Sequence, residues 1–241
     1  MVARVSDTSH ALAETRDIWR IAMNGIDALK DVLHAGCVIT KQSFPRWYEV
    51  HLKLLYWGIK RYQKRKWKKH WKAVHVYVVL PAPRKLYLRY VKRIGENQFA
   101  AGYVEKGDHI LFEQTWPVAK WTHPHYLHDK TFALNKFHVE FNVGSMVDEA
   151  CQWIGKPYDL GDLADFAISG LLLGLYKRVI RFVGDKARRL GVCSTVAGHI
   201  LNAGGCDIEQ PNATTPAYYE GNATGWSVLH RFERGKLVQQ T

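Results

Sequence analysis

The spacing of apolar positions along the chain predicts one long helix, then a series of strands, then several helices and a last strand. Residues 9–34 carry apolar side chains at helical intervals, and Gly36 ends that pattern. Alternating or β-branched runs predict strands over 37–40, 73–80, 86–91, 99–104, 109–114, 137–143 and 226–232. Helical patterns fall over 146–154, 160–183 and 192–203. Because strands and helices are grouped rather than alternating, this order indicates an α+β fold.

Residues 44–72 differ from the rest of the chain because they are rich in basic side chains with aromatic side chains interleaved among them. Eight cations fall within thirteen positions: Lys60, Arg61, Lys64, Arg65, Lys66, Lys68, Lys69 and Lys72. Four tryptophans are interleaved with them, at positions 47, 57, 67 and 71. The segment predicts a helix or a long charged excursion. With the formal net charge of +12 for the whole chain, it predicts attraction to nucleic acid, anionic lipid or an anionic wall polymer.

The composition, the apolar runs and the cysteines each add to this picture. The chain has 241 residues, of which 47% are hydrophobic, so it can bury a large core. Residues 1–20 have no apolar central run, and the run 166–176 is about half as long as a membrane span. The four cysteines lack a C-x-x-C pair and metal-ligand spacing. We therefore expect a cytoplasmic or virion-associated protein with reduced thiols, no transmembrane helix and no metal or other cofactor.

Cys193 is the candidate nucleophile because it stands at the predicted first turn of the helix 192–203. The partial positive charge and unpaired N–H groups of a helix start favour the thiolate form of a cysteine. His75, in an apolar strand, is the candidate base. The alternative is a buried, inert thiol beside a histidine that makes a structural hydrogen bond at a sheet edge. His199 lies about 240° around the helix from Cys193, which predicts a helix-surface or packing residue rather than a partner of the thiol.

A cysteine hydrolase also needs a polar group that orients its histidine. Glu113 lies in an apolar strand, where burying an unpaired carboxylate is costly, although an outward-facing glutamate is the alternative. Glu140 and Asn142 are second choices on the same reasoning. Tyr158, in the turn Gly-Lys-Pro-Tyr-Asp, is a candidate to stabilise an oxyanion, and Asp159 suits the cap of the next helix.

Taken in order, these segments resemble the permuted branch of the NlpC-type papain-like superfamily, the YiiX-like group, with lecithin:retinol acyltransferase as a distant relative. The matching stretches are Val-His-Val-Tyr-Val-Val, Phe-Glu-Gln-Thr-Trp-Pro, Gly-Lys-Pro-Tyr-Asp, Val-Cys-Ser-Thr-Val-Ala-Gly and Thr-Thr-Pro-Ala. The resemblance implies a circularly permuted papain-like domain over 35–241, with a central antiparallel sheet and packed helices. A helical extension at 1–34 would precede it, and 44–72 would be an insertion. The chain departs from the family pattern at Cys37, where the family has Asp, and at Thr195, where an acidic residue is common.

The resemblance also implies roles for individual residues. Cys193 matches the nucleophile, His75 the base, Glu113 the polar third residue and Tyr158 the tyrosine near the site. The implied activity is a cysteine-dependent hydrolase or acyltransferase acting on an amide, ester or thioester, in a cell-wall peptide or a lipid acyl group. The competing interpretation is a basic structural or virion protein with an inactive papain-like fold, which binds nucleic acid or a membrane through 44–72.

Overall fold

In a computed structural model of the chain, the residues described are 32–42, 57–61, 63–64, 73–90, 100–127, 130–161, 191–209, 211, 214–220, 225–234 and 236–240. The predicted helix over 9–34 lies almost wholly outside the described residues, as do most of 160–183 and much of 44–72. Within the described ranges, no helix has the length and apolar content needed to cross a bilayer.

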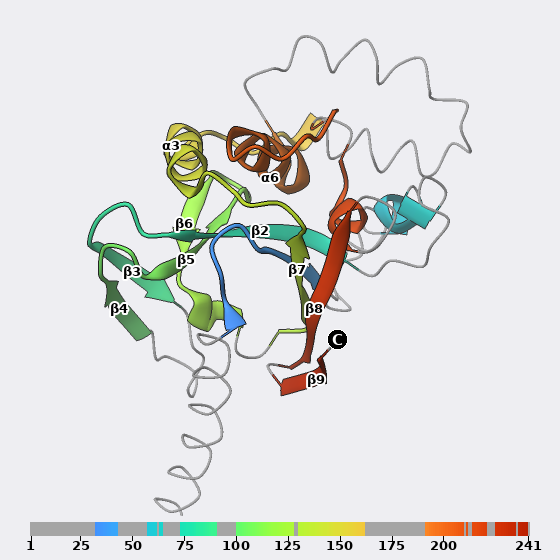
Figure 1. The fold of residues 1–241 in the computed structure, drawn as a ribbon, viewed down its shortest axis with the longest axis horizontal. Helices are drawn as coiled ribbons and strands as arrows, with labels where there is room; N and C mark the ends of the chain where they lie inside the picture. The colour runs from blue at the N-terminus through green and yellow to red at the C-terminus, as the bar shows by residue number, and fades with distance from the viewer. Residues whose placement is uncertain are drawn as a thin grey trace, which may run out of the picture.

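Seven strands form one antiparallel sheet through the middle of the molecule (Figure 1), in the order β6-β5-β2-β1-β7-β8-β9. Their bounds are β1 Val38–Gln42, β2 Ala73–Pro81, β5 His109–Glu113, β6 Lys120–Thr122, β7 Phe132–Phe137, β8 Trp226–Glu233 and β9 Lys236–Gln240. The strand β2, which carries His75, has β5 on one side and β1 on the other. His75 therefore lies in an interior strand of the sheet.

The helices α3 (Val143–Trp153) and α6 (Cys193–Ala203) lie side by side over one face of this sheet (Figure 1). Short 3-10 helices follow β6 and precede β8: η1 (Pro124–Leu127) and η3 (Pro216–Tyr219). Alternate side chains of a strand point to opposite faces. On β2 this sends Val76, Val78 and Leu80 toward α3 and α6, whereas Tyr77 and Val79 pack with Leu127 and Leu134 on the other face.

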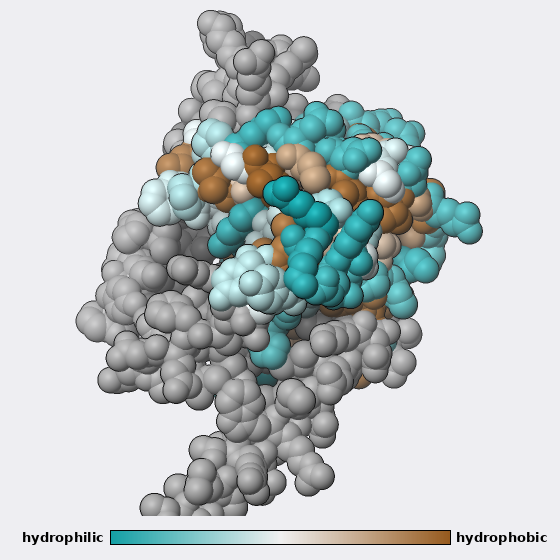
Figure 2. Space-filling view, turned by 90° about the vertical axis from the view of Figure 1, so that its left-hand side faces the viewer, coloured by the Kyte–Doolittle hydropathy of each residue, from teal (hydrophilic) through white to brown (hydrophobic). Residues whose placement is uncertain are grey.

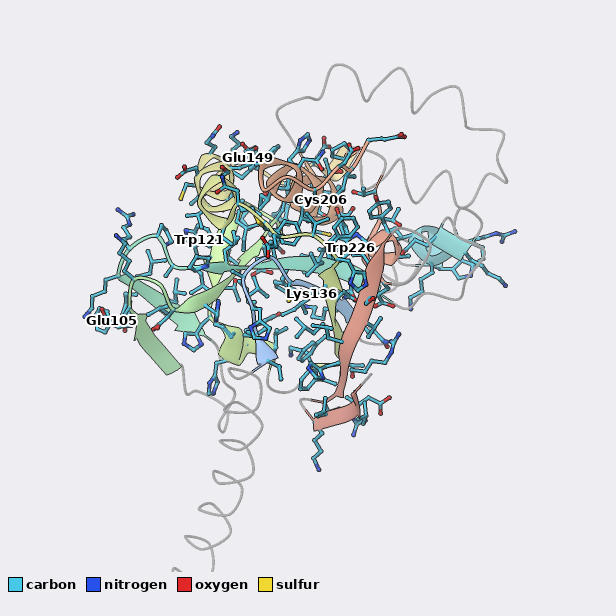
Figure 3. All side chains as sticks on the ribbon, in the orientation of Figure 1. Glu105, Trp121, Lys136, Glu149, Cys206 and Trp226 are labelled. Carbon is cyan, nitrogen blue, oxygen red and sulfur yellow. The ribbon has the colours of Figure 1, made fainter. Side chains whose placement is uncertain are left out.

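The sheet therefore separates two hydrophobic cores, and the larger one lies beneath the helices. Its buried members include Met146 and Ala150 of α3 and Val196 and Ile200 of α6. Figure 3 shows the side chains that fill the space between the helices and the sheet, with Trp121 of β6 below α3 and Trp226 at the start of β8. The start of α6 is thus held against β2 by apolar burial, the dominant favourable term in folding.

A separate two-stranded sheet is formed by β3 (Leu86–Tyr90) and β4 (Ala100–Val104). Its inner side chains Leu86 and Leu88 pack against a small cluster, whereas Tyr87 and Tyr103 face outward with their ring centres 4.9 Å apart. Figure 2 views the molecule from the side on which β3, β4 and α3 lie in Figure 1. Hydrophilic residues cover most of the coloured surface there, with smaller hydrophobic groups between them.

The mixed α+β class with an antiparallel sheet is confirmed. The strands predicted around 37–40, 73–80, 86–91, 99–104, 109–114 and 226–232 are present, within the described residues, to within two residues at each end. The helix predicted over 192–203 begins at Cys193, and the helix predicted over 146–154 begins three residues early, at Val143.

The strand predicted over 137–143 is wrong, because β7 ends at Phe137 and residues 138–142 connect it to α3. The Asn142 side chain accepts a hydrogen bond from the Ser145 N–H (3.1 Å) and caps α3. Phe137 and Phe141 both pack against the larger core, the second from this connection. Their spacing mimics the alternation of a strand although only Phe137 belongs to one.

Candidate active site

Cys193 is the first residue of α6, and its side chain is almost completely buried. The strand β5 pairs with β2 only as far as Tyr77↔Glu113, so Val76 and His75 have no β5 residue opposite them. The Cys193 sulfur lies beside this unpaired part of β2, where it is hydrogen-bonded to the backbone of Val76. Because no β5 residue lies between them here, the thiol of a helix that packs over one face of the sheet can contact His75.

The environment of Cys193 favours its thiolate. Burial raises the pKa of the thiol, but the charge of His75, a hydrogen bond from His75 and backbone hydrogen bonds at Val76 and Ser194 together lower it below its ordinary value. The N-terminus of α6 adds the positive end of a helix dipole at the same atom. The three other cysteines, which are also free thiols, have raised pKa values: Cys37, Cys151 and Cys206.

His75 lies between Cys193 and Glu113. Its Nε2 is 3.2 Å from Glu113 Oε2, which leaves Nδ1 as the ring nitrogen for the hydrogen bond with the sulfur. Burial lowers the pKa of His75, but the Cys193 charge and hydrogen bonds to Cys193 and Glu113 raise it to about 8. The edge of the ring meets Tyr77, with ring centres 4.7 Å apart. These contacts restrain the imidazole on both sides.

Glu113 is only 5% exposed, and both of its carboxylate oxygens have partners. Oε2 faces His75, whereas Oε1 accepts a hydrogen bond from Thr122 Oγ1 (2.6 Å) and lies 3.3 Å from Lys120 Nζ. Burial raises the pKa of this carboxyl, but the hydrogen bond and charge of His75, then Thr122 and Lys120, lower it to about 2. Glu113 is therefore ionised at neutral pH and faces inward.

Sequence reasoning missed Thr122 and Lys120 because the three-residue strand β6 was not predicted. A buried carboxylate needs hydrogen-bond donors, so a buried Glu113 already implied partners of this kind. Positions 120 and 122 share one face of their strand, as alternate residues do. Pairing β6 with β5 places that face beside Glu113.

The Tyr158 backbone lies next to the entry of α6. Tyr158 forms a parallel bridge with Gly191, and its N–H donates to the Pro117 carbonyl (3.0 Å). The Gln114 amide holds the same turn by donating to the Pro157 carbonyl (3.0 Å). The structure thus brings residue 158 beside the segment that leads into Cys193. The oxyanion role of the Tyr158 side chain stays a prediction.

The second-choice orienting residues are not part of this arrangement. Glu140 is exposed in the connection before α3, and Asn142 caps that helix. His199 stacks on Trp153, with ring centres 5.7 Å apart and planes inclined by 25°. Of the two roles predicted for His199, a helix-surface residue or a packing residue, this contact supports packing.

The backbone that follows Cys193 is fixed by three buried hydrogen bonds. Ser194 Oγ donates to the Thr214 carbonyl (2.8 Å), and Thr214 Oγ1 donates to the Ser194 carbonyl (2.9 Å). The Tyr219 hydroxyl donates to the same carbonyl (2.7 Å). The segment that includes η3 therefore holds the first turn of α6 in place.

Of the eight predicted polyanion-binding cations, Lys60, Arg61 and Lys64 are described, in the helical residues 57–61 and 63–64. The Arg61 guanidinium lies 5.1 Å from the ring centre of the half-exposed Trp57. The other five lie outside the described residues: Arg65, Lys66, Lys68, Lys69 and Lys72.

In the part of the chain that the structure covers, no group of three or more His, Cys, Asp and Glu side chains is arranged to hold a metal ion. Comparisons of the chain with models of protein families, with curated proteins and with solved structures found no match. We therefore interpret the site from its own geometry.

Proposed function

We propose that the protein is a cysteine-dependent hydrolase or acyltransferase in which Cys193 is the nucleophile, His75 the general base and acid, and Glu113 the group that orients His75. The observation that carries the proposal is the position of His75, which bonds to Cys193 on one side and to the ionised Glu113 on the other. Nucleophile, base and orienting group within hydrogen-bond reach are the signature of nucleophilic catalysis.

In the proposed reaction, the Cys193 thiolate attacks the carbonyl carbon of an amide, ester or thioester and forms a C–S bond. The His75 imidazolium then gives its proton to the leaving amine, alcohol or thiol as the bond to that group breaks. The product of this half-reaction is a thioester on Cys193 with a neutral imidazole. Water or another acceptor attacks the thioester, His75 takes its proton, and the thiolate and imidazolium are restored.

The order of elements supports a circularly permuted papain-like domain as the finer description of the fold. The strand with His75 precedes the helix with Cys193, Glu113 lies on the strand paired with β2, and Tyr158 precedes the helix. On this proposal the substrate is a cell-wall peptide or a lipid acyl group, and Tyr158 is the candidate to stabilise the oxyanion.

The proposal is tested by alkylation with iodoacetamide. At pH 6–7, Cys193 is expected to react faster than Cys151, although Cys151 is exposed and Cys193 is buried, because Cys193 alone among the four cysteines has a lowered pKa. Mass spectrometry of peptides gives the rate at each cysteine. His75→Ala is expected to remove this advantage.

His199→Ala is the matched control, because His199 lies on the same helix as Cys193 and packs on Trp153. It is expected to leave the Cys193 rate unchanged. Equal rates at Cys193 and Cys151, or a Cys193 rate that survives His75→Ala, would refute the proposal.

A second candidate function, binding of a polyanion, is favoured by how the helical residues 57–61 and 63–64 are oriented. Ile59 and Gln63 are buried, whereas Trp57 and Lys64 are exposed and Arg61 stacks on Trp57. With its apolar side already covered, this helix presents cations and an aromatic ring, which suits contact with phosphates and bases better than insertion into a lipid bilayer.

A further inference from the structure

Gln63 lies in the basic segment, yet its side chain is fully buried and hydrogen-bonded at both ends. Its Nε2 donates to the Ala73 carbonyl (3.2 Å), and its Oε1 accepts from the Ala217 N–H (2.8 Å). A buried amide is costly unless its donor and acceptor are both used. This one side chain therefore joins the residues around it to the start of β2, ten residues later, and to η3, 154 residues later.

The first contact fixes the end of β2 that carries His75. Ala73 is the first residue of β2, two positions before His75. The pairing of β2 with β1 is irregular here, because Lys41 lies opposite His75 while the next residue, Gln42, lies opposite Ala73. A bulge interrupts the regular ladder. The bond from Gln63 supplies a fixed point at the place where strand pairing is weakest.

The second contact leads to Cys193. Ala217 belongs to η3, and Tyr219 of the same 3-10 helix donates its hydroxyl to the Ser194 carbonyl. Ser194 is the residue after Cys193, and its backbone hydrogen-bonds to the sulfur. The acceptor end of Gln63 is thus linked through η3 to the first turn of α6.

We infer that Gln63 is a positioning residue for the proposed cysteine site, one that sets the separation between the start of β2 and the start of α6. The inference rests on the proposed function. His75 comes from the first of these elements and Cys193 from the second. The helical residues 57–61 and 63–64 are therefore a supporting part of the site as well as a carrier of charge.

A purely structural role for Gln63 would have a different signature. Its loss would then lower the free energy of unfolding and leave the folded Cys193 as reactive as before. A positioning role changes the charge interaction and hydrogen bond through which His75 lowers the Cys193 pKa, and both depend on distance. The pH dependence of Cys193 alkylation separates the two roles.

The test compares Gln63→Met with a control, Asn202→Leu. Asn202 is also an amide bonded at both ends, since Nδ2 donates to the Ile208 carbonyl and Oδ1 accepts the Ile208 N–H, both at 2.8 Å. It lies at the opposite end of α6 from Cys193. Each variant keeps the approximate side-chain size and loses two hydrogen bonds.

Iodoacetamide alkylation of the full-length folded chain is followed from pH 5 to 9, with Cys151 as the internal reference and the melting temperature as the measure of stability. Gln63→Met is expected to slow Cys193 about tenfold near pH 6, as small misplacements of catalytic groups do, and to move the midpoint of its pH profile upward. Asn202→Leu is expected to change neither the Cys193 rate nor the midpoint of its pH profile.

Gln63→Glu is the second variant, in case Gln63→Met does not fold. When protonated, its carboxyl makes both bonds; when ionised, it places an oxygen against the Ala73 carbonyl. The Cys193 rate relative to the wild type is therefore expected to fall as this carboxyl ionises. If both Gln63 variants melt earlier but keep the wild-type rate and midpoint, the inference is wrong and the proposed function stands. If wild-type Cys193 reacts no faster than Cys151, the proposed function fails first.

Discussion

At the residue scale, the state of the site is decided by opposing effects on one imidazole. Burial lowers the pKa of His75, whereas Cys193 and Glu113 raise it to about 8. The Cys193 pKa moves in the opposite direction, also because of His75. Each group stabilises the charged form of the other, so their contact favours the thiolate–imidazolium pair over the neutral pair.

Removing the sulfur is therefore expected to change the titration of His75. In Cys193→Ala the largest cause that raises the His75 pKa is gone and burial remains, so the pKa falls from about 8 toward 6.5 or below. NMR titration of the histidine ring protons measures this, with the His75 signal assigned from a His75→Gln variant. The control is Cys206→Ala, another buried cysteine, which is expected to leave the value near 8. A His75 pKa that stays near 8 in Cys193→Ala would show that the thiolate is not the cause.

Glu113 makes a second prediction, which concerns stability in acid. Its pKa falls from 4.5 to about 2 on folding, so its contribution is present above pH 4.5 and is lost as the pH falls toward 2. That contribution is roughly 3 kcal/mol in the free energy of unfolding. In urea unfolding, Glu113→Gln is expected to lose correspondingly less free energy of unfolding between pH 5 and pH 2 than the wild type. Glu105→Gln, at an exposed glutamate paired with Lys85, should keep the wild-type pH dependence.

Single residues were predictable from sequence where chemistry restricts the choice. A thiol at a helix start, a histidine in an apolar strand and an acid in another such strand led to Cys193, His75 and Glu113, and the structure brings these three together. Gln63 was not predictable, because nothing in a run of lysines, arginines and tryptophans distinguishes a buried glutamine from a solvated one. Its partners Ala73 and Ala217 contribute only backbone atoms.

At the scale of elements, predictions succeeded where β-branched residues dominate and failed where tertiary contacts override local preference. The strand β7 contains Ala133, Asn135 and Lys136, which are weak strand formers, yet it pairs with β1 and β8. The Nδ2 group of the buried Asn135 is satisfied because it donates to the Val38 carbonyl and to Thr40 Oγ1. Long-range partners of this kind cannot be read from local pattern.

The helical residues 57–61 and 63–64 carry the prediction that follows from the second candidate function. Replacing Lys60, Arg61 and Lys64 together with glutamine is expected to weaken binding of single-stranded DNA and to reduce the slope of log affinity against log salt by about 2. Fluorescence anisotropy over a salt series measures both. The control replaces three exposed lysines with glutamine: Lys85, Lys106 and Lys236. It removes the same charge and is expected to change the affinity and the salt slope less. Equal effects of the two triple variants would mean that net charge alone attracts DNA.

At the scale of the whole molecule, the two cores depend on close contacts at a few glycines. Gly36 precedes β1 with a φ of 85°, and an added Cβ there would lie 2.5 Å from Phe141 Cδ2. Phe141 packs on the larger core beneath α3 and α6. The connection before α3 and the entry to β1 therefore meet where there is no room for a side chain.

Gly36→Ala is accordingly expected to lower the free energy of unfolding by about 2–4 kcal/mol, the sum of a backbone penalty and overpacking. Gly107→Ala is the matched control, since Gly107 has a φ of 93° but nothing within 4 Å of an added Cβ. It should lose only the backbone part, about 1–2 kcal/mol. Chemical denaturation of both variants measures the difference, and equal losses would show that Phe141 moves aside without cost.

The candidate nucleophile Cys193 and its candidate base His75 come from elements that the chain makes at different times. Between β2 and α6 a ribosome must synthesise β3 to β7 and α3, and η3 follows α6. A nascent chain therefore exposes Cys193 first as an ordinary thiol, with neither an imidazole beside it nor a folded helix start behind it. The sulfur gains its lowered pKa only when α6 docks at the place that β5 leaves open beside β2. Local unfolding that released α6 would therefore return Cys193 to an ordinary thiol.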